Sequence, residues 1–219
     1  MWATEVGRKR DNRSTATRHL ATGPAVNPRR LSQAISEGDG ISVIVEVDDP
    51  EAARDAQEAG AEALLVRSGL ESRLPSIRAA TELPILCRYD DQQATTLEGA
   101  DACLIDLGEG RGASIDRLGH TLGDRFELAP RISTDDDLEF VLEQLDPEIL
   151  VLSASSNDQT ALEHVLELLP DVPAGKLAIA DIDARTRDEV GELARAGVDG
   201  VIVAAGNVAH LVGAAPPEV

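Results

Sequence analysis

Charged and hydroxyl-bearing side chains recur at the ends of the short apolar runs in this chain. Each run is rich in Val, Ile, Leu and Ala without alternation, which is typical of a strand buried on both faces of a parallel sheet. The polar residues at or just after the ends of these runs are Glu46, Asp48, Arg67, Arg88, Asp90, Asp106, Arg131, Ser153, Ser155, Asp181, Asp183 and Asn207. Because parallel strands finish at the same edge, these side chains are predicted to converge on one site.

Carboxylates beside guanidiniums suit two kinds of chemistry. Arg88 and Arg131 are the candidates for binding an anionic ligand, since a guanidinium pairs with carboxylate or phosphate through two parallel hydrogen bonds. Glu46 and Asp181 can transfer protons as acid or base if burial raises their pKa values. The alternative is an internal ion-pair network that only neutralises the interior. Both interpretations stay open at this stage.

Other chemistries find little support in the sequence. No lysine is predicted at the convergent end, which argues against a Schiff base. The glycine-rich run over 108–112 fits either a phosphate-binding loop or a flexible turn. Three aspartates at 135–137 fit the first turn of a helix better than a metal site. Cys87 and Cys103 are expected to be buried and reduced. We therefore predict no metal and no cofactor.

Three glycines mark where helices pass directly into strands. Gly60, Gly99 and Gly197 each stand between a helix-like stretch and an apolar run. A helix often ends on a left-handed residue, which glycine adopts at little cost. The repeated joint predicts alternating helices and strands.

The apolar runs number eight. The expected strands cover residues 41–47, 62–67, 84–88, 101–106, 125–130, 148–153, 177–181 and 200–204, with helices expected between them, including 72–80, 91–98 and 114–122. Helix starts are predicted at Asp49, at Ser133 or Thr134, and at a capping box of Thr186 and Glu189. Eight such units predict a compact (β/α)8 TIM barrel over 31–219. An open doubly wound sheet is the alternative, but no glycine-rich dinucleotide turn follows the first strand.

Residues 1–30 differ from the rest of the chain, because they are rich in arginine and lack apolar periodicity. We expect a disordered basic tail, followed by a short helix over 28–36. The alternative is a basic arm that docks on an acidic surface, of this chain or of a partner.

Charge and hydropathy restrict the partners. The net charge of −20 argues against nucleic acid, which is bound by clustered Lys and Arg. No apolar run reaches the length of a membrane span, and no secretory signal is recognisable, so we expect a cytoplasmic protein. The expected partner is a small phosphorylated or carboxylate ligand, or another protein.

Several segments resemble indole-3-glycerol-phosphate synthase, a ribulose-phosphate-binding barrel of tryptophan biosynthesis. The resemblance covers about residues 31–212. It is carried by LSQAI at 31–35 with SVIVEV at 42–47, LPILCR at 83–88, IADIDARTRDEV at 179–190 and AGVDGVIV at 196–203. It implies a carbon–carbon lyase that closes a ring by decarboxylating a carboxyphenylamino-deoxyribulose phosphate, using a lysine acid, paired glutamates and a phosphate cradle.

The residues that the resemblance places in catalysis are mostly substituted. Glu46 matches the first-strand glutamate, but Asp48 and Arg88 stand where the family has lysines. Asp181 replaces a glutamate, and Arg131 replaces another. The candidate catalytic residues are therefore Glu46, Arg88 and Asp181.

The phosphate site implied by the resemblance is altered as well. The Ser-Pro loop after the first strand is missing, and alanines replace the phosphate-binding glycine and its small neighbour after the last strand. The candidate substrate-binding residues are Arg131, Ser153, Ser155, Gly206 and Asn207. Two hypotheses follow: a synthase-like enzyme of reduced activity, or a barrel that has lost catalysis and acts as a binding or interaction protein.

Overall fold

A computed structural model describes residues 29–38, 40–89, 97–107, 122–123, 125–154 and 161–211. Most of the basic segment, the glycine-rich run over 108–112 and nearly all of the helices expected over 91–98 and 114–122 lie outside these ranges. So do two of the polar residues predicted at the strand ends, Asp90 and Ser155.

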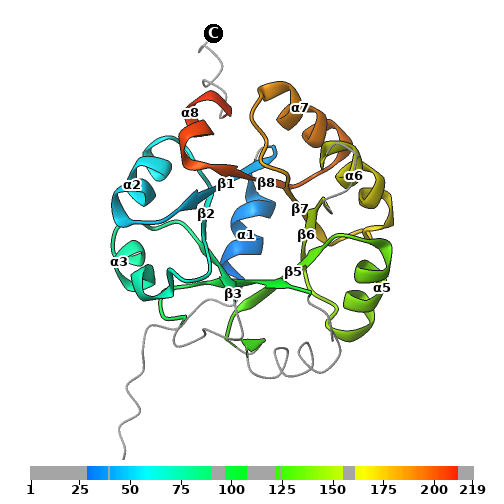
Figure 1. Cartoon of the computed structure of the whole chain (residues 1–219), viewed down its shortest axis with the longest axis horizontal. Coiled ribbons are helices and arrows are strands. Elements are labelled where there is room, and N and C mark those ends of the chain that lie inside the picture. Colours follow the sequence, from blue (N-terminus) through cyan, green and yellow to red (C-terminus); the bar gives the residue numbers. More distant parts are fainter. Residues whose placement is uncertain are drawn as a thin grey trace, which may run out of the picture.

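Eight parallel strands form a closed barrel in chain order, which confirms the predicted (β/α)8 fold (Figure 1). The strands are β1 (Ser42–Val47), β2 (Ala63–Val66), β3 (Ile85–Tyr89), β4 (Ala102–Asp106), β5 (Glu127–Ile132), β6 (Ile149–Ser153), β7 (Leu177–Asp181) and β8 (Gly200–Ala204).

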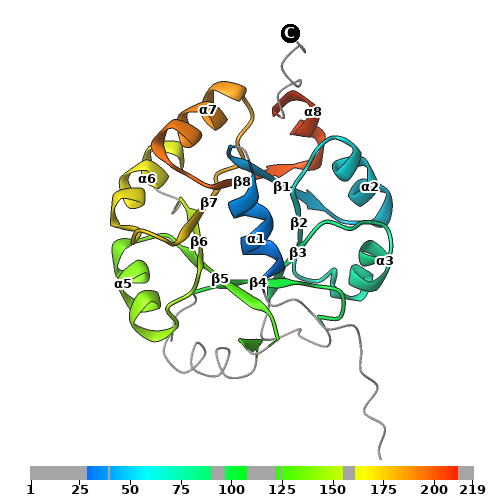
Figure 2. The same ribbon diagram turned by 180° about the vertical axis from the view of Figure 1, so that it is seen from behind.

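Helices surround the barrel, except for α1, which lies across its centre in both views (Figures 1 and 2). The helices are α1 (Arg30–Glu37), α2 (Pro50–Glu58), α3 (Leu74–Arg78), α5 (Asp135–Gln144), α6 (Ala161–Leu168), α7 (Arg187–Ala196) and α8 (Val208–Leu211), with 3-10 turns η1 (Glu71–Arg73), η2 (Leu169–Asp171) and η3 (Ala205–Asn207). In the described part of the chain, no helix is long and apolar enough to cross a membrane.

The predicted helix starts are confirmed by their hydrogen bonds. The Asp49 side chain accepts from two backbone N–H groups of α2, which has Pro50 at its first position. Thr134 caps α5, which decides between the two candidates there. Thr186 and Glu189 form the expected capping box of α7.

The three glycines at the helix–strand joints have left-handed backbones, as predicted. Their φ angles are 91° at Gly60, 102° at Gly99 and 100° at Gly197. Their surroundings differ. A Cβ at Gly99 would lie 3.1 Å from the carbonyl oxygen of Leu74, whereas a Cβ at Gly197 would meet nothing within 4 Å.

This difference predicts unequal costs for two matched substitutions. Gly197→Ala should lower the free energy of unfolding by about 1 kcal/mol, the cost of a left-handed alanine. Gly99→Ala should cost about 1–2 kcal/mol more, because the new methyl group also presses on backbone that cannot move freely. Urea denaturation of both variants measures the difference. Equal losses of stability in the two variants would show that the close approach of the new methyl group to Leu74 does not add to the cost at Gly99.

The strands are buried on both faces, which explains their unbroken apolar runs. In β1, Val43, Val45 and Val47 pack outward in the layer beneath the helices. Ile44 points inward and belongs to a second core inside the barrel. Leu31 and Ile35 of α1 belong to that same inner core, so α1 closes one end of the barrel.

Hydrogen bonds show which end α1 closes. The Glu127 carboxylate, at the start of β5, accepts from the backbone N–H groups of Leu31 (2.6 Å) and Ser32 (3.0 Å). Burial raises the pKa of Glu127, against the lowering effect of these bonds. Since these contacts involve the first residue of β5, α1 sits where the strands begin and leaves the opposite end for chemistry.

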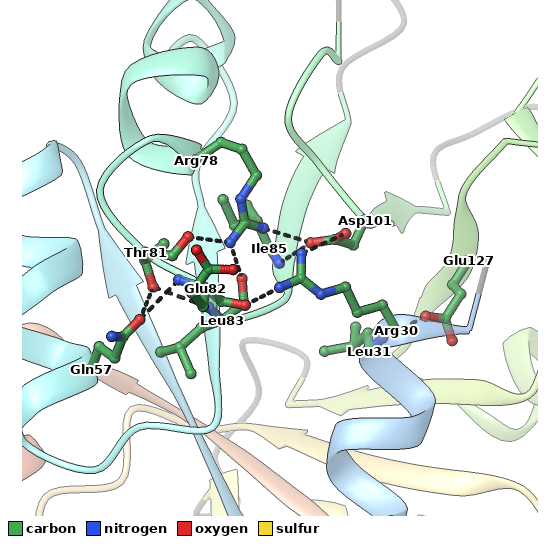
Figure 3. Close-up of polar contacts among 10 residues, drawn as sticks. All are labelled: Arg30, Leu31, Gln57, Arg78, Thr81, Glu82, Leu83, Ile85, Asp101 and Glu127. Carbon is green, nitrogen blue, oxygen red and sulfur yellow. Dashed lines mark hydrogen bonds and ion pairs between the residues drawn. The ribbon is translucent and has the colours of Figure 1, made fainter. Parts of the chain in front are cut away.

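Asp101 anchors this closed end (Figure 3). Its carboxylate accepts from Arg78 Nη1 (3.0 Å), from the backbone N–H of Ile85 (2.8 Å) and from Arg30 Nη1 of α1 (3.4 Å). The Asp101 side chain is only 8% exposed. The carboxylate therefore ties α1 and α3 to the start of β3.

The two cysteines are free and buried, in agreement with the prediction of reduced thiols. Cys87 and Cys103 are paired in register on β3 and β4 and face the outer core. Burial raises the pKa of both thiols, that of Cys87 to about 12. Thiolate is the reactive form, so both cysteines are expected to be chemically inert in the folded chain.

Candidate functional site

Seven of the polar residues predicted at the strand ends form one layer. Because side chains alternate between the two faces of a strand, each strand presents one last inward-facing position at its carboxyl end. We call this layer the upper tier. It consists of Glu46, Arg67, Arg88, Asp106, Arg131, Ser153, Asp181 and Ala204. It lies at the opposite end of the barrel from α1.

Arg88 on β3 is held by Asp106 on β4. Arg88 Nε donates to Asp106 Oδ2 at 2.7 Å, and Arg88 Nη2 donates to Asp106 Oδ1 at 2.9 Å. This bidentate pairing raises the pKa of Arg88, and the nearby Asp181 adds to the effect. The two side chains are 34% and 42% exposed. Arg88 is thus fixed in position, permanently charged and still open to solvent.

Arg131 on β5 continues this chain of charges. Its Nη2 lies 2.9 Å from Asp181 Oδ2 on β7, and its Nη1 lies 3.6 Å from Asp106 Oδ1. Its Nε is buried and has no hydrogen-bond partner among the described residues. An ionic chain therefore runs from β3 through β4 and β5 to β7, and it retains one unused donor.

The sequence placed Arg131 just beyond its strand, but β5 runs two residues further than expected. The prediction placed the end of the strand near Pro130, which lacks a backbone N–H group. A single missing donor interrupts a ladder only locally. Arg131 is paired in register with both Asp106 and Val151. It therefore lies within the strand, and the face of the strand from which its side chain projects is fixed.

Glu46 pairs with a different cation. Its carboxylate forms an ion pair with Arg67, which directly follows β2. Arg67 is 66% exposed and Glu46 only 23%. The upper tier therefore contains three carboxylates and three guanidiniums, and each guanidinium contacts at least one of the carboxylates.

Ser153 is fully buried at the end of β6. Its hydroxyl donates to the carbonyl oxygen of Ile132 (3.2 Å), so the Ser133 hydroxyl is the donor in their 2.9 Å contact. His164 of α6 lies over the same loop, with Nε2 2.9 Å from the Ser133 carbonyl oxygen. In this arrangement Ser153 joins β6 to the end of β5. Its assignment to substrate binding stays a prediction.

The remaining predicted residues lie around the rim. Gly206 and Asn207 follow β8 in η3, where a Cβ added to Gly206 would meet nothing within 4 Å. Asp183 pairs with Arg185 at 2.6 Å rather than with the tier. Asp48 accepts through its backbone carbonyl from Arg73 Nη1 at 2.8 Å. Within the described ranges, no ion pair or hydrogen bond joins these residues to the ionic chain, and the binding roles of Gly206 and Asn207 stay predictions.

Asp106 is the residue whose role sequence reasoning missed. The sequence predicts that Asp106 ends its strand but does not indicate a function for it. The signal was present, because Arg88 and Asp106 close adjacent strands with opposite charges. No group of three or more His, Cys, Asp or Glu side chains within the described ranges is arranged to hold a metal ion.

No protein-family model and no curated protein matches this sequence. Solved structures do match. The N-acetylmannosamine-6-phosphate 2-epimerase from Clostridium perfringens is 16% identical, with 77% of this chain and 88% of that chain covered and a TM-score of 0.59. The phosphoenolpyruvate phosphomutase from Streptomyces platensis subsp. rosaceus is 15% identical, with 80% and 79% covered and a TM-score of 0.63. At such identity the likeness shows the fold: the chain is a (β/α)8 TIM barrel.

Proposed function

We propose that this barrel binds a small phosphorylated or carboxylate ligand at Arg88 and Arg131 of the upper tier and does not carry out the ring closure of indole-3-glycerol-phosphate synthase. Two observations on the site support an anionic ligand. Arg88 and Arg131 both face the open end of the barrel, and their side chains remain 34% and 28% exposed. The two similar structures are of enzymes named for phosphorylated compounds, which agrees with this choice of ligand.

The pairing of Arg88 with Asp106 carries the argument against the synthase reaction. The resemblance assigns a lysine general acid to the position of Arg88. A general acid must release its proton near neutral pH, and a guanidinium does not. Here the pKa of Arg88 is raised further by the Asp106 carboxylate. Loss of a general acid typically reduces the rate by a factor on the order of 10² to 10⁴.

A synthase-like lyase of tryptophan biosynthesis is the second candidate. Its support is that Glu46 and Asp181 lie in the same tier and are only 23% and 21% exposed. Two partly buried carboxylates at the mouth of a barrel are suitable for proton transfer. In this case Arg88 would hold the substrate's carboxylate or phosphate. A protein that only binds another protein is the remaining alternative.

The family substrate distinguishes these candidates. Purified protein is incubated with the carboxyphenylamino-deoxyribulose phosphate, indole fluorescence reports turnover, and calorimetry reports binding. We expect saturable binding without turnover. Turnover that Glu46→Gln abolishes, and that the control Glu51→Gln on the exposed side of α2 leaves intact, would instead establish the lyase. The absence of both binding and turnover would exclude this substrate and the lyase, and the absence of phosphate binding as well would contradict the proposed function and favour a protein partner.

A further inference from the structure

The carboxylate of Asp106 occupies the place where an anionic ligand of Arg88 would bind. This inference rests on the proposed function and concerns its ligand class. We propose that Asp106 is an internal competitor for the two arginines and thereby selects phosphate dianions over carboxylates. The natural ligand is then a phosphorylated compound rather than a carboxylic acid.

The geometry of the Arg88–Asp106 pair is that of ligand recognition. Nε and Nη2 of Arg88 each donate to a different oxygen of Asp106, at 2.7 and 2.9 Å. The same two-point pairing is how arginine binds phosphate and carboxylate ligands. An incoming anion therefore has to replace Asp106 on this edge of the guanidinium.

The displacement of Asp106 is feasible because the pair is open to water. Asp106 is 42% exposed, and Arg88 is 34% exposed. Ion pairs in such surroundings contribute little net free energy, because water screens both charges. The released carboxylate can turn toward solvent, while Arg88 and Arg131 remain on strands that are paired in the barrel.

Exchange of Asp106 for another carboxylate brings no advantage, since one carboxylate replaces another. Phosphate differs in two respects. It carries nearly two negative charges and has three strong acceptor oxygens. Asp106 hydrogen-bonds to Arg88 but stays 3.6 Å from Arg131 Nη1, beyond normal hydrogen-bond length. A phosphate group with its third oxygen can hydrogen-bond to both arginines, so only phosphate gains from the exchange.

The test compares two anions and two variants of the full chain. Inorganic phosphate and acetate are titrated at pH 8 and constant ionic strength, with calorimetry and the shift in Tm as readouts. Asp106→Asn removes the competing charge. Asp183→Asn is the control, because it removes a charge near the same end without contacting Arg88 or Arg131, and asparagine tolerates the φ of 52° there.

We expect wild-type protein to bind phosphate but not acetate. Asp106→Asn should bind phosphate about tenfold more tightly. This is the change in affinity expected when a charged hydrogen-bond partner of Arg88 is replaced by a neutral one, which competes less strongly. It should also acquire acetate binding, so that selectivity falls, whereas Asp183→Asn should resemble wild type. Circular dichroism and the Tm without ligand check that each variant is folded.

Two failures of this test are distinguishable. If wild type binds phosphate and Asp106→Asn binds it no better than Asp183→Asn does, the competitor role is wrong and the proposed function stands. If neither wild type nor either variant binds phosphate, the proposed anion site itself is wrong. Binding by Asp106→Asn alone would overturn the proposed selection of phosphate, because the natural Asp106 would then exclude both anions.

Discussion

Replacement of Asp101 with alanine is expected to lower the free energy of unfolding by about 3 kcal/mol, the typical cost of removing one partner from a buried ion pair. Asp101 is 8% exposed and Arg78 is 23% exposed. Burial lowers the pKa of Arg78, and the Asp101 charge opposes that shift. Without Asp101, the Arg78 guanidinium stays away from water and lacks its carboxylate, while the N–H of Ile85 loses its acceptor.

Urea denaturation followed by circular dichroism measures this loss. Asp101→Asn should cost less, because the amide oxygen can still accept from the Ile85 N–H. Asp55→Ala, on the exposed face of α2, is the matched control and should change stability by no more than about 0.5 kcal/mol. A loss for Asp101→Ala as small as that of the control would mean that α1 and α3 are held by apolar packing alone.

Replacement of Arg88 with methionine is expected to weaken phosphate binding by about 100-fold, since two charge-assisted hydrogen bonds to the ligand disappear. The stability of the folded protein should hardly change in this variant. The partner Asp106 is 42% exposed, so its loss of Arg88 should change the free energy of unfolding by less than about 1 kcal/mol. Calorimetric titration with phosphate and urea denaturation give the two quantities.

Arg67→Met is the matched control for Arg88→Met. Arg67 belongs to the same tier and pairs with a carboxylate, but that carboxylate is Glu46 and not Asp106. Phosphate affinity should stay within about threefold of wild type, because a screened rim charge has a small effect on a site that it does not touch. If Arg88→Met instead loses stability and leaves affinity unchanged, the arginines of the tier only neutralise the barrel interior.

The fold could be predicted because its signals are local. Glycine after a helix, a capping residue before one, and an apolar run without alternation each depend on a few neighbouring residues. Gly197 illustrates the first signal, Asp49 and Thr186 illustrate the second, and the structure confirms each of these residues in its role. Eight repeats of such a unit leave few arrangements other than a closed barrel.

The closed end of the barrel could not be predicted in the same way. Arg30 and Asp101 are 71 positions apart, and Leu31 and Glu127 are 96 apart. No local pattern marks these contacts, because they exist only once α1 has turned across the strand ends. The charge of Asp101 at the start of a strand looked ordinary in the sequence, yet the structure makes it one of the most buried acidic side chains described.

The sequence by itself placed the polar residues of the upper tier at strand ends, because the unbroken apolar runs mark where each buried strand stops. It placed Glu46, Arg88 and Asp181 at one end of the barrel without any structure. Only the tertiary structure decided the pairing: Arg88 with Asp106, Arg131 with Asp181, and Glu46 with Arg67. Pairing depends on the register between strands, and register is set by the closure of the whole barrel and not by any single strand.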